Sequence, residues 1–134
     1  MAKKTYPGSC HCRAVRFEAD VDLASGTFRC NCSICFKSRA RLAGVPATSF
    51  RLLAGEDRLQ DYQFGPKRIH HLFCTGCGVR PFSRGQDAKG SASYAVRVNC
   101  LDGVDEAEFV GAPVKYFDML HDNMTSPPAE TRHL

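Results

Sequence analysis

The sequence predicts a mainly β protein that folds as a single domain. Hydrophobic and polar residues alternate in short segments, glycines and prolines separate these segments, and long amphipathic helical patterns are absent. A length of 134 residues, 43% of them hydrophobic and 24% charged, suits one domain with a modest core. We therefore expect short strands that share one core.

Two segments carry the clearest strand pattern. In residues 14–21 the hydrophobic side chains from Val15 to Val21 occupy every second position, so they lie on one face. Residues 94–100 repeat this alternation and end at the turn signal Asp102-Gly103. Shorter strands are expected at residues 27–32, 43–45, 60–64, 69–74 and 106–110.

Helices are expected to be few and short. One is expected directly after Cys35 and another within residues 114–120. Residues 125–134 contain two consecutive prolines and few hydrophobic side chains, so we expect a flexible tail there. The expected domain then spans residues 1–124.

The cysteines indicate metal ligation in a reducing compartment. The first eight residues include two lysines but no hydrophobic segment, and no hydrophobic run reaches membrane-spanning length. We therefore expect a cytoplasmic protein without a secretory signal or a membrane partner. Because such a compartment keeps thiols reduced, the eight cysteines favour thiolate ligands over a disulfide framework.

Two cysteine pairs are predicted to form one closed metal site. Between Cys74 and Cys77 the two-residue spacing lets a tight turn aim both sulfurs at one ion, and Gly76 and Gly78 permit positive φ. On an extended backbone, Cys10 and Cys12 would project from the same face. Four thiolates saturate zinc, which is typical of a structural site; a redox disulfide and iron–sulfur ligation are the alternatives.

A second group, Cys30, Cys32 and Cys35, is predicted to hold a second zinc ion. Three ligands leave one coordination position for water or an incoming thiol, whose pKa the metal lowers. This open position makes an enzyme plausible. The alternative is a second structural zinc that a fourth, unidentified residue completes.

The remaining cysteine and three histidines are not predicted to be ligands. Cys100 shares a strand face with Val96 and Val98 and is expected to be a buried hydrophobic residue. His11, His70 and His71 are expected at the surface or next to the metal ligands rather than on the metal.

Three motifs resemble the glutathione-dependent formaldehyde-activating enzyme family, which includes the centromere protein V domain. They are GSCHCRAVRF at residues 8–17, CNCSIC at residues 30–35 and FCTGCG at residues 73–78. Residues 98–103 and 114–123 are also similar to the family, so the resemblance covers nearly the whole chain. It implies a zinc-bound β-tent fold of short antiparallel strands, with a structural site at Cys10, Cys12, Cys74 and Cys77 and a second zinc at Cys30, Cys32 and Cys35.

The resemblance also implies an activity, the joining of glutathione to formaldehyde to give S-(hydroxymethyl)glutathione; the enzyme is classed as a carbon–sulfur lyase for the reverse direction. The reaction needs a thiolate, an aldehyde beside it and a proton donor, for which the sequence offers no clear candidate. Because glutathione carries two carboxylates, Lys37, Arg39 and Arg41 are candidate anchors, with ordinary solvated charge as the alternative.

Two other functions compete with the enzyme. One is a zinc-stabilised module that binds protein or nucleic acid without catalysis. Binding of nucleic acid is not favoured, because the only adjacent basic pairs are Lys3-Lys4 and Lys67-Arg68. In addition, two zinc ions on seven thiolates would lower the formal charge from +4 to roughly +1. The other is a thiol redox or metal-handling protein, for which eight cysteines in 134 residues are sparse.

Overall fold

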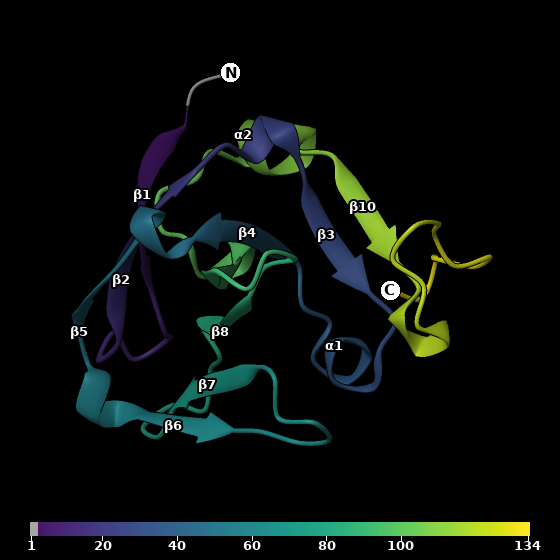
Figure 1. The fold of residues 1–134 in the computed structure, drawn as a ribbon. Coiled ribbons are helices and arrows are strands. Elements are labelled where there is room, and N and C mark those ends of the chain that lie inside the picture. The colour runs from purple at the N-terminus through teal and green to yellow at the C-terminus, as the bar shows by residue number, and fades with distance from the viewer. Residues whose placement is uncertain (1–2) are drawn as a thin grey trace.

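The computed structural model describes residues 3–134 and contains two β-sheets with short helices between their strands (Figure 1). The predicted mainly β, single-domain fold is confirmed. The first sheet has the antiparallel order β1-β2-β5. Its strands are β1 (Lys4–Ser9), β2 (Arg16–Val21) and β5 (Phe50–Ala54).

The second sheet has seven strands in the order β10-β3-β4-β9-β8-β7-β6. Its strands are β3 (Thr27–Cys30), β4 (Leu42–Pro46), β6 (Leu59–Tyr62), β7 (His70–Cys74), β8 (Phe82–Gln86), β9 (Ala92–Arg97) and β10 (Val114–Phe117). Against the expectation of antiparallel strands throughout, β10 pairs with β3 in parallel. The two strands are far apart in the sequence, and Figure 1 shows them side by side.

The helices are all short. The two α-helices are α1 (Ser33–Ser38) and α2 (Glu106–Gly111). The 3-10 turns are η1 (Leu23–Ser25), η2 (Ala47–Ser49), η3 (Glu56–Arg58), η4 (Val98–Cys100) and η5 (Met119–His121). Within residues 3–134, no helix is long and apolar enough to cross a membrane.

Two sequence predictions are wrong because short segments carry little local information. Residues 106–110 were expected to form a strand but lie in α2, where Glu106 and Glu108 occupy the first turn and favour the positive end of the helix dipole. Residues 114–120 were expected to be helical, but β10 and η5 occupy them. The β-branched and aromatic side chains of β10 gain a hydrogen-bonded partner in β3.

Strand boundaries also differ from the prediction. Strands β1, β5 and β8 were not predicted; β1 contains Pro7 and Gly8, which usually mark turns, but it is an edge strand, where proline is tolerated. The strand predicted at residues 94–100 ends at Arg97, and η4 follows it. The helix predicted after Cys35 already begins at Ser33.

The core lies between the two sheets. Phe17 from β2 and Phe50 from β5 pack against Phe82 from β8 and Tyr94 from β9, so the aromatic cluster joins both sheets. The rings of Phe50 and Tyr94 stack with centroids 3.9 Å apart. Each such aromatic pair contributes about 0.5–1.5 kcal/mol beyond the burial of its surface.

Residues 125–134 contact α1 near their end. The Arg39 guanidinium donates to the carbonyl oxygen of Leu134 at 3.3 Å, and the ring of Phe36 lies 5.7 Å from that of His133. The flexibility of this tail and the domain boundary at residue 124 stay predictions.

Gly8 is expected to tolerate no side chain. It faces Phe17 across the β1–β2 pair, and a Cβ at Gly8 would overlap the buried Phe17 ring. Gly8→Ala should therefore lower the free energy of unfolding by about 1–3 kcal/mol in urea denaturation. The matched control is Gly111→Ala, where a Cβ meets no atom within 4 Å; equal effects of the two substitutions would contradict this reading.

Candidate metal centre and the adjoining pocket

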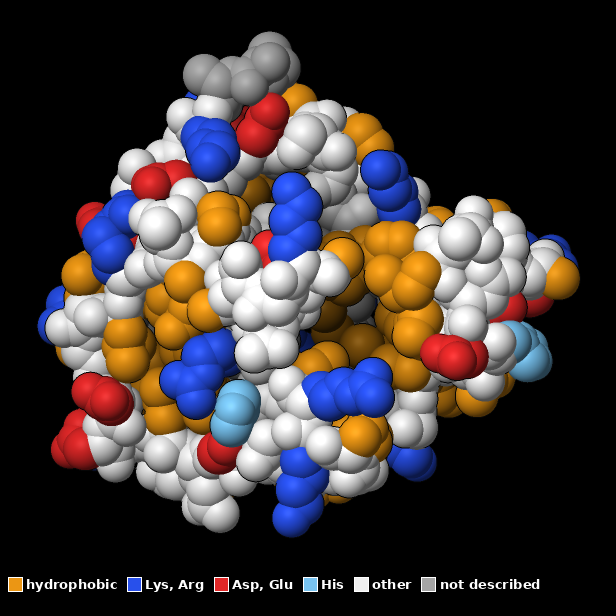
Figure 2. All heavy atoms as spheres, viewed as in Figure 1, with side chains coloured by type: hydrophobic (Ala, Val, Ile, Leu, Met, Phe, Trp, Pro, Cys, Tyr) orange, Lys and Arg blue, Asp and Glu red, His pale blue; other side chains and the backbone are white. Residues whose placement is uncertain are grey.

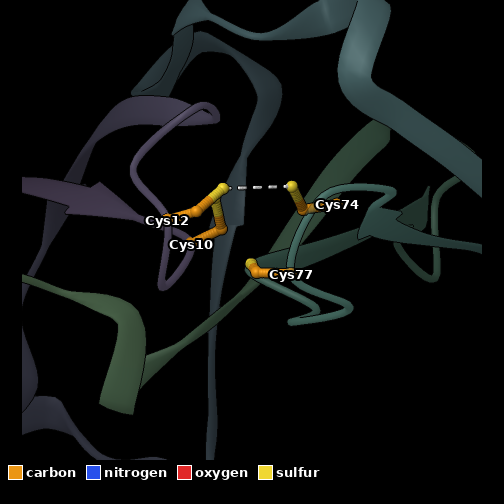
Figure 3. Close-up of side chains that lie close together, drawn as sticks. All are labelled: Cys10, Cys12, Cys74 and Cys77. Atoms are coloured by element: carbon orange, nitrogen blue, oxygen red, sulfur yellow. Dashed lines mark hydrogen bonds between the residues drawn. The ribbon is translucent and has the colours of Figure 1, made fainter.

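Four cysteines from two distant segments meet at one point (Figure 3). Cys10 and Cys12 lie in the turn after β1, Cys74 ends β7, and Cys77 lies in the turn that follows. Their four sulfurs all lie within 4.8 Å of one another, with Cys12 Sγ 3.7 Å from both Cys10 Sγ and Cys74 Sγ. One metal ion could be held by all four.

The backbone around the first pair is a turn, not the extended segment that the sequence suggested. The Arg13 amide donates to the Cys10 carbonyl at 3.2 Å, and the Cys10 amide donates to the Val15 carbonyl at 3.1 Å. Arg13 has φ +67°, a left-handed conformation that helps the chain reverse. Turn geometry, and not alternation, therefore brings the sulfurs of Cys10 and Cys12 together.

Backbone amides hydrogen-bond to the sulfurs of this group, and at Cys74 and Cys77 they lower the pKa and favour the thiolate form. The Val15 amide donates to Cys10 Sγ and the Gly76 amide to Cys74 Sγ, each at 3.3 Å. Donation from the backbone amides of Cys12 and Val79 lowers the pKa of Cys77 to about 6. Because metals bind thiolates, this four-sulfur donor set fits a zinc ion.

The two glycines of the second pair have different roles. Gly78 has φ +77°, which few residues other than glycine adopt. Gly76 has no positive φ; a Cβ there would lie 3.6 Å from the sulfurs of Cys12 and Cys74. Only Gly78 therefore meets the expectation of a positive φ.

The second cysteine group forms where β3 passes into α1. Cys30 is the last residue of β3, Cys32 caps α1 and Cys35 lies in its first turn, and the three sulfurs lie within 4.8 Å of one another. Within residues 3–134, no fourth cysteine, histidine or carboxylate ligand joins this group. An ion held here would keep a coordination position free.

Cys32 is the thiol of this group that most readily loses its proton. Its pKa lies well below the ordinary value because the thiols of Cys30 and Cys35, and then the backbone amides of Cys35 and Ile34, hydrogen-bond to its sulfur. This donor set also fits a zinc ion.

Asn31, which the sequence analysis did not single out, fixes the loop between the first two of these cysteines. Its Nδ2 donates to Asp118 Oδ1 at 2.7 Å, and its Oδ1 accepts from the Leu120 amide at 2.9 Å. The loop is thereby tied to the segment that follows β10. An asparagine between two cysteines has no distinctive spacing that would reveal this role.

A pocket of about 890 Å³ opens beside the second group, and Cys30, Cys32 and Cys35 line it. Figure 2 shows a hollow on this face with hydrophobic side chains inside it and lysine or arginine side chains beside it. Two arginines that the sequence did not indicate, Arg80 and Arg97, also line the pocket. They lie far from the cysteine motif in the chain, so only folding reveals them.

A smaller cleft of about 500 Å³ adjoins this pocket, and Lys37 and Arg80 line it. The two hollows share Ile34 and Ser38 of α1, Phe64 and Arg80. Of the predicted glutathione anchors, Lys37 therefore lies in a cleft next to the second cysteine group.

The other two predicted anchors lie elsewhere. Arg39 ends α1 and donates to Leu134, as described above. Arg41 is buried, and its guanidinium donates at 3.0 Å to Thr27 Oγ1 and to the carbonyl oxygens of Phe109 and Ala112. Arg41 thus joins β4 to the α2 region and does not line the pocket.

The residues predicted not to be ligands lie outside both cysteine groups. Cys100 is buried, as predicted, and burial raises the pKa of its thiol to about 11. His11 is exposed in the Cys10–Val15 turn and His70 hydrogen-bonds to Asp61. His71 differs from these, because its imidazole lines the large pocket.

Two comparisons with known proteins found similarity over most of the chain. The model of the family described as glutathione-dependent formaldehyde-activating enzyme matches residues 5–115, a range that holds all eight cysteines. A crystal structure of a Rhodobacter sphaeroides protein aligns with a TM-score of 0.69 and 31% sequence identity, over 81% of this chain and 99% of that chain.

Proposed function

Because the chain belongs to the glutathione-dependent formaldehyde-activating enzyme family, we propose that it is a zinc-dependent enzyme that joins glutathione, or a similar thiol, to an aldehyde. In the reverse direction it acts as a carbon–sulfur lyase. The observation that carries this proposal is a group of three cysteines, without a fourth cysteine, histidine or carboxylate ligand among the described residues, in the wall of a large pocket. A purely structural metal site needs no such pocket. The family's zinc-bound β-tent fold and a cytoplasmic location belong to the same proposal.

The two cysteine groups would hold two zinc ions with different roles. Cys10, Cys12, Cys74 and Cys77 supply four ligands and would hold the structural ion. Cys30, Cys32 and Cys35 would hold the second. Zinc at this second site would act as a Lewis acid and lower the pKa of a thiol that takes its open position.

The reaction forms one bond and moves one proton. The glutathione sulfur attacks the carbonyl carbon, the electron pair of the C=O π bond moves to the oxygen, and the proton lost by the thiol ends on that oxygen. The chain's task is therefore to hold both partners in line and to support the proton transfer.

The smaller cleft suits the charged part of glutathione. Lys37 and Arg80 line it, and their cationic groups can pair with the two carboxylates of the tripeptide. Arg80 also lines the large pocket, so a tripeptide bound in the cleft would have its sulfur near the three cysteines.

His71 is the candidate proton carrier. Its imidazole lines the pocket together with Cys32, and burial followed by the charge of Arg80 lowers its pKa. The ring is therefore neutral at pH 7, so one nitrogen can accept the thiol proton and later return it.

The test is the rate at which glutathione and formaldehyde exchange with their adduct, measured by NMR exchange spectroscopy with zinc-loaded protein. We expect the wild-type protein to accelerate this exchange above the uncatalysed rate. Lys37→Ala and Arg80→Ala should each raise the KM for glutathione by about 5–10-fold, because each removes one charge-assisted contact.

The matched control is Lys89→Ala in the turn between β8 and β9, which should leave the KM unchanged. If the zinc-loaded wild-type protein does not raise the exchange rate above the uncatalysed rate, the proposed enzymatic function is refuted and a zinc-stabilised binding module is favoured.

A further inference from the structure

We propose that this site takes aldehydes larger than formaldehyde, whose carbon part is apolar or aromatic and fills the large pocket. This inference rests on the proposed function, since it names the substrate class of the same three-cysteine site. It is carried by the size of the pocket, the chemistry of its walls and its position beside Cys30, Cys32 and Cys35.

Three small residues, Gly44, Ala95 and Ser83, leave room in the pocket. Gly44 of β4 pairs with Ala95 of β9, Ala95 pairs with Ser83 of β8, and Ser83 pairs with His71 of β7. These four residues form a row across the sheet, and all of them line the pocket. Because successive strand residues point to opposite faces, larger neighbours such as Val45 and Val96 can fill the core without filling the pocket.

The walls around this row are apolar. Phe28 of β3 and Phe117 of β10 line the pocket with their ring centroids 5.3 Å apart, and Leu42, Met119 and Met124 line it as well. Methionine side chains adapt to ligands of different shape, and aromatic rings offer flat contact surfaces. The lining therefore favours an apolar group without requiring one shape.

A formaldehyde adduct leaves most of this pocket unused. Formaldehyde adds one carbon and one oxygen to the glutathione sulfur, whereas a volume of about 890 Å³ is in the range of sites that hold much larger ligands. Apart from Arg80, Arg97 and Lys115, the lining offers no charged partner to the tripeptide, and burying its charges and amides against the apolar walls is unfavourable. The carboxylates of the tripeptide are instead complementary to the cationic side chains of Lys37 and Arg80 in the smaller cleft.

The site thus has two regions that meet at α1. The polar cleft would hold the tripeptide, the apolar pocket would hold the carbon part of the aldehyde, and the shared residues Ile34, Ser38 and Phe64 lie between them. The chemical step is unchanged: the thiol sulfur bonds to the aldehyde carbon, the π pair moves to oxygen, and the thiol proton ends on that oxygen. No oxidant or reductant is needed.

The first experiment measures binding with two stable thioethers, S-benzylglutathione and S-methylglutathione, by isothermal titration calorimetry on zinc-loaded protein. Burial of the benzyl group should make the first bind about tenfold more tightly or better. Equal affinities would overturn the inference.

Gly44→Phe tests the pocket directly. A Cβ at Gly44 meets no atom within 4 Å, so a phenyl ring can enter the pocket without a clash at its base. We expect this substitution to weaken S-benzylglutathione binding by about tenfold and to change S-methylglutathione binding by less than about twofold. Ala95→Leu, one strand away, should act in the same direction if the first variant folds poorly.

The control is Gly111→Phe at the end of α2, which should leave both affinities unchanged because a Cβ there also meets no atom within 4 Å and Gly111 does not line the large pocket. In the exchange assay, phenylacetaldehyde should show a kcat/KM about tenfold or more above that of formaldehyde in the wild type.

The outcomes separate the two proposals. The inference would be overturned if the kcat/KM for formaldehyde were at least as high as that for phenylacetaldehyde. It would also be overturned if the Gly44→Phe protein bound both thioethers tightly. Either result would leave the proposed function standing. Absence of thioether binding together with absence of catalysis would overturn both.

Discussion

Replacing Cys74 with serine is expected to unfold the protein. Cys74 is fully buried at the end of β7, and its sulfur lies within 4.8 Å of those of Cys10, Cys12 and Cys77. The proposed ion would join the β1–β2 turn of the first sheet to the β7 turn of the second. Structural zinc contributes about 10–16 kcal/mol in small domains, which matches or exceeds the about 5–15 kcal/mol of a typical folded protein.

The measurement is the near-ultraviolet circular dichroism signal and thermal unfolding of the Cys74→Ser protein, with zinc per chain by elemental analysis. The matched control is Cys100→Ala, which removes a buried thiol outside both groups and should cost only about 1 kcal/mol. A cooperative unfolding transition of Cys74→Ser near that of the wild type would show that no structural ion is held there.

Replacing the second cysteine group is expected to abolish catalysis while the fold persists. The triple substitution Cys30→Ser, Cys32→Ser and Cys35→Ser should lower the rate of adduct exchange by about 100-fold or more, because the thiol would lose the metal that activates it. The fold should persist, because the main core lies between the sheets and includes none of these three residues.

Elemental analysis with and without glutathione checks this prediction. We expect two zinc ions per chain to fall to one in the triple variant, and glutathione to perturb only the second site of the wild type. Ser33→Ala, on the same helix, is the matched control and should keep both ions. If the triple variant unfolds and glutathione leaves the zinc sites of the wild-type protein unchanged, both sites are structural and a binding module is favoured.

The cysteine groups could be predicted largely from sequence because metal ligation depends on spacing. Three cysteines within six residues can reach one ion where the chain turns, and the structure brings them together where β3 meets α1. Because zinc prefers four ligands, the pair Cys10 and Cys12 was predicted to share one ion with the pair Cys74 and Cys77. The turn at Cys10 was missed, since a separation of one residue fits both a strand and a turn.

The sequence by itself therefore determined the mainly β class, the two sulfur groups and the family. Only the tertiary structure decided that residues 106–111 are helical, that β10 pairs in parallel with β3, and that Arg41 lies inside the protein while Arg80 lines the pocket. The physical reason is the distance along the chain over which each feature is decided. The spacing of cysteines within a motif is local, whereas strand pairing and pocket walls depend on residues far apart in the chain. The row from Gly44 to His71 is the clearest case, because four ordinary residues define a pocket only when four strands align them.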